Sequence, residues 1–250
     1  MIKPPIEIPM LFSQPMVQAI LDGTKTETRR IVKFPRKLKD SVMEMMADNT
    51  DPNISDYVNF TRMQDGYKDG VRSIWEYDGD PNAFSIKHPQ VGDIIWCRET
   101  WRPDINFLHN TTKVFSRKIR FKADSSFILV PPEETEWFDD LCKDGKLTYK
   151  SSMFLRRKFA RIFLEVTDIR IERLKSITQE DCLREGVVEV TKDGNIKKYC
   201  VLDDGDISTT EWKHMPYTAQ ECYKNLWEKI NGIGSWDLNP WIIRIEFKRI

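Results

Sequence analysis

The chain of 250 residues carries 39 Lys and Arg against 39 Asp and Glu, so its formal net charge is zero. A protein that follows a long stretch of duplex normally has a basic excess, so this balance argues against extended DNA binding but permits a local basic pocket. With 40% hydrophobic residues, including 8 Trp, 7 Tyr and 13 Phe, the chain is not of the disordered class. Its length suits one domain at the upper end of the usual size range, or two small ones.

The cysteines and histidines show no spacing that is typical of a metal site. Five cysteines lie far apart without a C-x-x-C pair, and His88, His109 and His214 form no H-x-H or H-x-x-x-H pair. No stretch approaches the roughly 18 apolar residues that a membrane span requires, and the N-terminus has no apolar segment of a secretion signal. We therefore expect a cytoplasmic protein without membrane contact, metal or cofactor.

A short helix of about two turns is predicted between Ser13 and Gly23. Ser13 is expected to cap it, Pro15 lies in its first turn, and apolar residues then recur at helical spacing until Gly23 stops it. Such a helix packs by one face and delivers the polar residues that follow it to the surface.

The stretch from Gly23 to Arg30 reads G-T-K-T-E-T-R-R and holds three hydroxyls, three cations and one carboxylate. Its continuation to Val32 is β-prone, which predicts a loop that runs into a strand. Because side chains alternate along a strand, Lys25 and Thr28 can cooperate only if the chain turns or bulges between them, which a turn just after Gly23 allows. Taken alone, the run also fits a solvated edge strand whose charges prevent sheet association.

Residues 34–90 are rich in turn formers and charges, and they predict an excursion from the core with a helix over 38–47 and a small hairpin. Residues 94–101 are then expected to form a strand whose first half is buried. The second half of that strand carries three candidate site residues, Arg98, Glu99 and Trp101.

A second insertion covers residues 103–157. Within it, the alternation over 118–123 predicts a half-buried strand. Trp137 and Phe138 lie among acidic residues, which indicates an acidic surface segment.

The strongest β signal runs from Ala160 to Leu174. Its apolar phase shifts at Thr167 and Asp168, which predicts a bulge or a corner of the kind that a small barrel requires.

Two capped helices follow this strand, one from Thr178 to Gly186 and one that begins at Thr218. Between them, residues 187–217 form a polar insertion with a hairpin-type turn, and alternation over 241–248 predicts a last strand. The fold class that we expect is α+β, a small mixed β-barrel flanked by short helices and interrupted by long insertions.

Several of these segments, in this order, resemble the ASCH domain family of the PUA-like superfold, especially its larger members, which phages and prophages often encode. The G-x-K-T-x-T-R-R block is the most specific part of the resemblance, and the insertions at about 34–90, 103–157 and 187–217 lie outside the family core. One departure is Ser152 to Arg157, where related large members usually have a His-Met-Pro-Arg-like run, so no role of that histidine carries over. The resemblance implies a single domain over residues 1–250. The matching segments are 9–30, 92–101, 164–174, 180–186 and 236–250.

The resemblance also implies a PUA-like barrel with a basic cleft that binds RNA or a modified nucleoside or nucleotide. Small ASCH proteins are amidohydrolases that remove the acyl group from N4-acetylcytidine with a Lys, a Thr and a Glu. By residue-to-residue match these are Lys25, Thr28 and Glu185 in this chain.

This assignment is chemically sensible if Lys25 is neutral. Thr28 supplies the hydroxyl and Lys25 the base, but a lysine with the reference pKa near 10.4 is protonated at pH 7. Partial burial and the neighbouring Arg29 and Arg30 would lower that pKa. Glu185 then orients Lys25 or carries the proton to the leaving nitrogen, although a carboxylate too close to Lys25 would oppose its activation.

The remaining candidates are substrate-binding residues. Arg29 and Arg30 can alternatively bind phosphate, and Trp101 and Trp241 can stack on a base. Trp101 also fits a core position, and Arg98 and Glu99 also fit a structural ion pair.

Three functions remain open at this point: an amidohydrolase of an N4-acyl cytosine, a non-catalytic RNA-binding module, and a ribonuclease in the same charged pocket.

Overall fold

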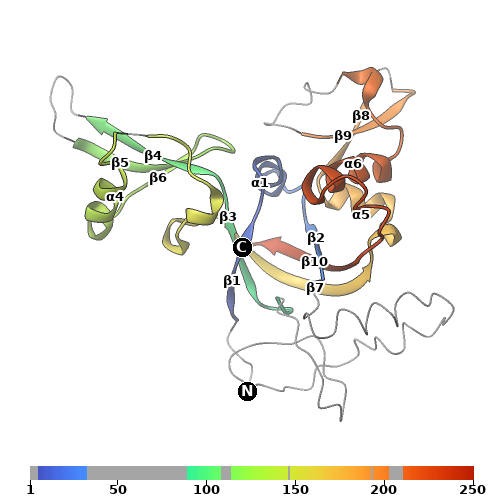
Figure 1. Cartoon of the computed structure of the whole chain (residues 1–250), viewed down its shortest axis with the longest axis horizontal. Helices are drawn as coiled ribbons and strands as arrows, with labels where there is room; N and C mark the ends of the chain where they lie inside the picture. Colours follow the sequence, from blue (N-terminus) through green and yellow to red (C-terminus); the bar gives the residue numbers. More distant parts are fainter. Residues whose placement is uncertain (1–4, 33–88, 108–113, 146, 193, 203–210) are drawn as a thin grey trace, which may run out of the picture.

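The computed structural model describes residues 5–32, 89–107, 114–145, 147–192, 194–202 and 211–250 (Figure 1). Within these ranges, ten β-strands form three open sheets beside four α-helices, which confirms the mixed α+β class. The expected closed barrel is not found among the strands described. The helix predicted over 38–47 and the hairpin predicted with it lie outside the described residues.

The central sheet has five strands in the order β1-β3-β7-β10-β2. The parallel pair β1–β3 lies at one edge, the other pairs are antiparallel, and β2 forms the opposite edge. The helix α1 connects the two edge strands and packs its buried residues Val17 and Ile20 on the sheet core. The bounds are β1 (Glu7–Leu11), α1 (Gln14–Leu21), β2 (Glu27–Ile31), β3 (Ile94–Arg98), β7 (Phe163–Arg173) and β10 (Trp241–Arg249).

The predicted bulge in the long strand is confirmed. In the β7–β10 ladder, Asp168 pairs with Glu246 while Val166 pairs with Phe247, so Thr167 is the extra residue. An extra residue reverses the side-chain phase. The bulge therefore explains why the apolar alternation of the sequence shifts at this point.

A second group of elements packs beside β10 and contains the helices α5 (Gln179–Arg184) and α6 (Ala219–Asn231). The side chains of Thr178 and Thr218 cap these helices as predicted, the first of them in a full capping box. The insertion 187–217 contributes the hairpin of β8 (Val187–Thr191) and β9 (Lys197–Val201).

No helix in the described parts of the chain combines the length and apolar character needed to cross a bilayer.

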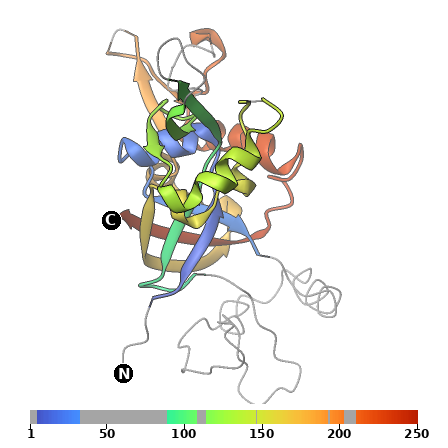
Figure 2. The same cartoon turned by 90° about the vertical axis from the view of Figure 1, so that its left-hand side faces the viewer.

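The insertion 103–157 builds a separate lobe on the side of the central sheet away from α5 and α6 (Figure 1), which Figure 2 turns towards the viewer. Its sheet consists of β4 (Trp101–Phe107), β5 (Val114–Phe121) and β6 (Phe127–Leu129), and α4 (Thr135–Leu141) packs on it. The prediction that Trp137 and Phe138 belong to an acidic surface segment is wrong in part. Phe138 is fully buried in the core of the lobe, whereas Glu136, Asp139 and Asp140 lie on the exposed face of α4 and Glu134, before the helix, is buried as well.

Gly186, directly after α5, is expected to tolerate no side chain. Its φ of +100° is unfavourable for other residues, and a Cβ there would lie 3.3 Å from the Cβ of Ala19 on α1. Gly186→Ala should therefore lower the free energy of unfolding by about 1 to 2 kcal/mol or more in urea. Gly194→Ala is the matched control, because its φ of +83° carries the same backbone strain without any atom within 4 Å. Equal losses in the two variants would contradict the close packing of α1 on Gly186.

Candidate functional site

A cavity of about 230 Å³ lies between β2, the end of α5 and α6. Four predicted site residues, Thr28, Arg29, Arg30 and Glu185, line it. They come from segments about 160 residues apart in sequence, and the antiparallel β2–β10 pairing and the α5–α6 packing bring them together. The other walls are formed by Tyr223, Trp227 and mostly apolar neighbours.

Lys25 contacts Glu185 at this site, as the residue-to-residue match predicts. Its Nζ donates to Glu185 Oε2 at 2.5 Å and to the Glu185 carbonyl oxygen at 2.9 Å, and the residue is only 2% exposed. The predicted turn after Gly23 is present, with φ of +77°. Backbone hydrogen bonds from Lys25 to Ala19 and from Thr26 to Arg184 then fix the loop between α1 and α5.

The environment of Lys25 lowers its pKa from the ordinary value. Burial is the largest cause, since a charged amine loses its hydration, and the positive charge of Arg30 acts in the same direction. The carboxylate of Glu185 opposes the shift, as a counter-charge at hydrogen-bond distance must. The result is an amine that gives up its proton more readily than an exposed lysine.

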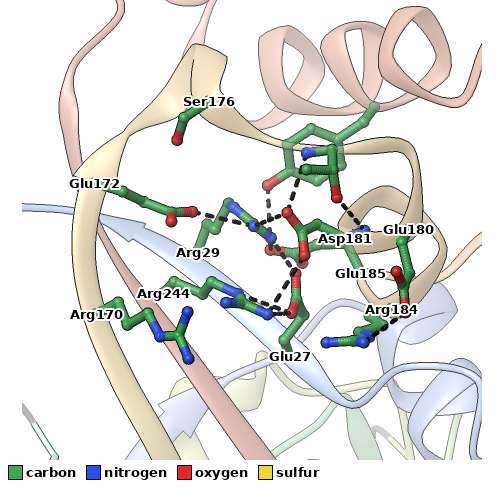
Figure 3. Close-up of polar contacts among 12 residues, drawn as sticks. Glu27, Arg29, Arg170, Glu172, Ser176, Glu180, Asp181, Arg184, Glu185 and Arg244 are labelled. Atoms are coloured by element: carbon green, nitrogen blue, oxygen red, sulfur yellow. Dashed lines mark hydrogen bonds and ion pairs between the residues drawn. The ribbon is translucent and has the colours of Figure 1, made fainter.

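Arg29 is the centre of a buried ion network (Figure 3). Besides a hydrogen bond to the carboxylate of Glu27, its guanidinium lies 3.1 Å from Glu172, 3.3 Å from Asp181 and 3.4 Å from Glu185. Burial would lower the pKa of Arg29, but the carboxylates of Glu185 and Glu27 raise it, so the group stays cationic. Arg29 therefore holds Glu185 in place and has little capacity left for a ligand.

Glu27 completes the network on the sheet. It is fully buried, and Arg244 on β10 donates to its Oε2 at 2.9 Å. Burial raises the pKa of Glu27, and the neighbouring arginines oppose that shift. Glu27 and Arg29 lie two residues apart on the edge strand and share one face, so the strand presents an ion pair to α5.

Thr28 is 2% exposed and lines the cavity. Within the described parts of the chain, its hydroxyl has no hydrogen-bond partner and is not bonded to Lys25. The expected cooperation of these two residues therefore stays a prediction, whereas the Lys25–Glu185 contact is present.

Arg30 differs from Arg29 in having few partners. It donates from Nη2 to the carbonyl oxygen of Leu11 at 2.8 Å and lies 5.4 Å from the ring centroid of Phe12, while its Nε is buried without a partner among the described residues. Burial lowers its pKa, and the charge of Glu185 opposes that shift. The Nε of Arg29 also lacks a partner, so the two arginines differ in their ion pairs: Arg30 has no carboxylate partner among the described residues, and its charge is left for an anion or a carbonyl oxygen.

The other predicted substrate-binding residues do not line the cavity. Trp101 is 1% exposed and packs in the core of the lobe, so its position is structural. Glu99 forms a two-point ion pair with Arg161, at 2.8 and 2.7 Å, instead of the expected pair with Arg98. Arg98 itself lies over the ring of Trp96, 4.9 Å from its centroid.

Trp241 opens β10 and lies under the guanidinium of Arg173, which is 4.3 Å from its ring centroid. The ring faces a cation of β7, and Trp241 is absent from the cavity wall. The prediction of a base-stacking tryptophan therefore has no geometric support at either Trp101 or Trp241.

Sequence reasoning missed Tyr223, whose hydroxyl donates to Glu185 Oε1 at 3.3 Å from inside the cavity wall. The apolar spacing of α6 indicated a packed face at this position, but nothing in that spacing could show that the hydroxyl contacts a carboxylate.

The role of Glu27, by contrast, had a signal in the sequence. Glu27 lies two residues before Arg29 in the predicted strand, so both side chains are expected on one face, where a carboxylate and a guanidinium can pair.

Comparisons of the chain with models of protein families, with curated proteins and with solved structures find no match. The resemblance to the ASCH family accordingly stays a prediction that depends on the motif and its context.

Proposed function

We propose that the chain is an ASCH-type protein that binds a modified cytosine nucleoside in this cavity and hydrolyses its N4-acyl amide. The observation that carries the proposal is the Lys25–Glu185 contact, 2.5 Å long, beside a cavity that Thr28 lines. The volume of about 230 Å³ is below the roughly 300 to 1,000 Å³ of drug-sized ligand pockets, which favours a single nucleoside over a longer RNA segment.

In the first step, the Thr28 oxygen attacks the acyl carbon and its proton passes to the neutral amine of Lys25. The resulting tetrahedral intermediate collapses as the carbon–nitrogen bond breaks. The proton moves through Lys25 and Glu185 to the exocyclic nitrogen, which leaves as the amino group of cytidine. Water then adds to the acyl carbon, the ester bond breaks, the Thr28 oxygen regains a proton, and the carboxylic acid departs.

Arg30 and Tyr223 have supporting roles in this scheme. The guanidinium of Arg30, which lines the cavity and has no carboxylate partner among the described residues, is the cationic group for the oxygen that becomes negative in the intermediate. Tyr223 keeps Glu185 oriented by its hydrogen bond, and burial raises the pKa of its hydroxyl, so the group stays a donor.

The proposal is tested by incubating the purified chain with N4-acetylcytidine and measuring release of cytidine and acetate. We expect release by the native chain, and a loss of at least about 100-fold in Thr28→Val, because the nucleophile is removed while the shape is kept. Thr26→Val is the matched control, since Thr26 is an exposed threonine two residues earlier, in the loop directly before β2. It should retain activity.

Absence of release by the native chain would contradict the proposal. The alternatives then separate in a second assay with labelled RNA. Cleavage of the RNA would identify a ribonuclease, and binding without cleavage would identify a non-catalytic RNA-binding module.

A further inference from the structure

The sheet of the lobe has two unlike faces. Side chains of residues that pair across neighbouring strands lie on the same face of a sheet. On one face, Ile119 and Phe121 of β5 are fully buried in the core that α4 also contributes to. The opposite face, which we call the outer face of the lobe sheet, carries cations and half-exposed rings. It contains Arg102, Lys118, Arg120, Lys122 and Phe127, together with Tyr149.

Each exposed ring of the outer face has two cations beside it. Lys118 lies 4.2 Å and Arg120 5.5 Å from the ring centroid of Phe127, which is 46% exposed. Arg102 lies 5.7 Å and Lys122 5.9 Å from the ring centroid of Tyr149, which is 44% exposed. Cations and rings therefore alternate across the face.

The outer face carries a local positive charge although the whole chain is neutral. Its one acidic side chain in the sheet is Asp104, which Arg120 neutralises at 2.6 Å. Arg102, Lys118 and Lys122 have no carboxylate partner within the described residues. Three uncompensated cations thus surround two aromatic rings on a surface that no described element covers.

We propose that the outer face of the lobe sheet binds single-stranded nucleic acid. The phosphates contact the three unpaired cations, and unpaired bases stack on Phe127 and Tyr149. A duplex fits less well, because its bases are already stacked on one another and only its phosphates could be used. An acidic peptide would use the cations but leave both rings without partners. The site is separate from the cavity between β2 and α6, since none of these residues lines that cavity.

The test is fluorescence polarisation with labelled single-stranded RNA and DNA oligonucleotides, and with the duplex of the same sequence, over a series of salt concentrations. We expect single strands to bind more tightly than the duplex. Each neutralised phosphate of a single strand contributes a slope of about −0.7 in log K against log salt, so three cations predict a slope of about −2.

Two variants assign the binding to this face. Phe127→Ala should weaken single-strand binding by about tenfold, because one stacking contact is lost. Lys122→Glu should weaken it and flatten the salt dependence. Phe154→Ala and Lys143→Glu are the matched controls, since both are exposed residues of the same lobe outside its sheet, and both should bind as the native chain does. Circular dichroism verifies that each variant is folded.

The proposal is overturned by any of four results. These are no single-strand binding at low salt, equal affinity for the duplex, native affinity in both Phe127→Ala and Lys122→Glu, or displacement of the oligonucleotide by excess N4-acetylcytidine. The last result would assign the oligonucleotide to the cavity instead of the outer face.

Discussion

Lys25→Met is expected to lower the rate of N4-acyl cleavage by about 100- to 10,000-fold, the usual contribution of a general base. Methionine keeps the length and the apolar stem of the side chain, so the packing against Gly186 is largely retained. The amine that accepts the proton of Thr28 is lost, and Glu185 loses its closest partner. Cytidine release under saturating N4-acetylcytidine measures the effect.

A second buried lysine provides the control. Lys198 is 3% exposed, and its Nζ donates to the carbonyl oxygen of Trp212 at 2.8 Å, away from the cavity wall. Lys198→Met therefore removes the side-chain amine of a buried lysine without touching the site, and it should keep the rate of cleavage. If Lys25→Met and Lys198→Met had the same activity as the native chain, Lys25 would not be the base.

The pH dependence distinguishes a base from a structural cation. A base must be neutral, so kcat/KM should rise with pH and level off above the pKa of Lys25, which burial places below its usual 10.5. Glu185 opposes that shift, so Glu185→Gln should move the midpoint of the rise to lower pH, even though the rate itself falls. A midpoint that stays in place or moves upward in Glu185→Gln would show that the titrating group is not Lys25.

The elements of the fold were predictable where local chemistry decides them. Threonine caps, the stop at Gly186 and the phase shift at Thr167 each depend on a few neighbouring residues, and all are present. Closure of a sheet depends on which distant strands meet. The expected barrel came from the resemblance and from one bulge, and neither determines whether edge strands pair.

The site was predictable in part for the same reason. The motif identified Lys25 and Glu185, which meet across 160 residues. Trp101 was predicted to bind substrate because it lies at the end of a predicted strand. In the structure it begins β4 of the lobe and is buried there. The end of a strand indicates a site only if the residues that follow stay at the protein surface. Here the chain passes from β3 directly into the hydrophobic core of the lobe.

Arg29→Met is expected to lower the free energy of unfolding by about 3 to 5 kcal/mol, the largest stability effect that we predict. The substitution removes the one cation that four carboxylates share. Three of them keep another cationic partner, and Glu172 is left with none among the described residues. Lysine cannot restore the network, because a single ammonium does not reach several carboxylates as a planar guanidinium does. Urea unfolding followed by tryptophan fluorescence gives the free energy without adding salt that screens the charges.

Arg170→Met is the matched control for this loss. Arg170 lies on β7 directly opposite Arg244 and forms an ion pair with Asp168 at 2.7 Å, but its side chain is 62% exposed. Water solvates that pair, so its removal should change the free energy of unfolding by less than about 1 kcal/mol. The contrast tests burial itself, because both variants delete an arginine from the same sheet. Equal losses would contradict the proposal that burial makes the network around Arg29 stabilising, and with it the proposal that Arg29 holds Glu185 in place.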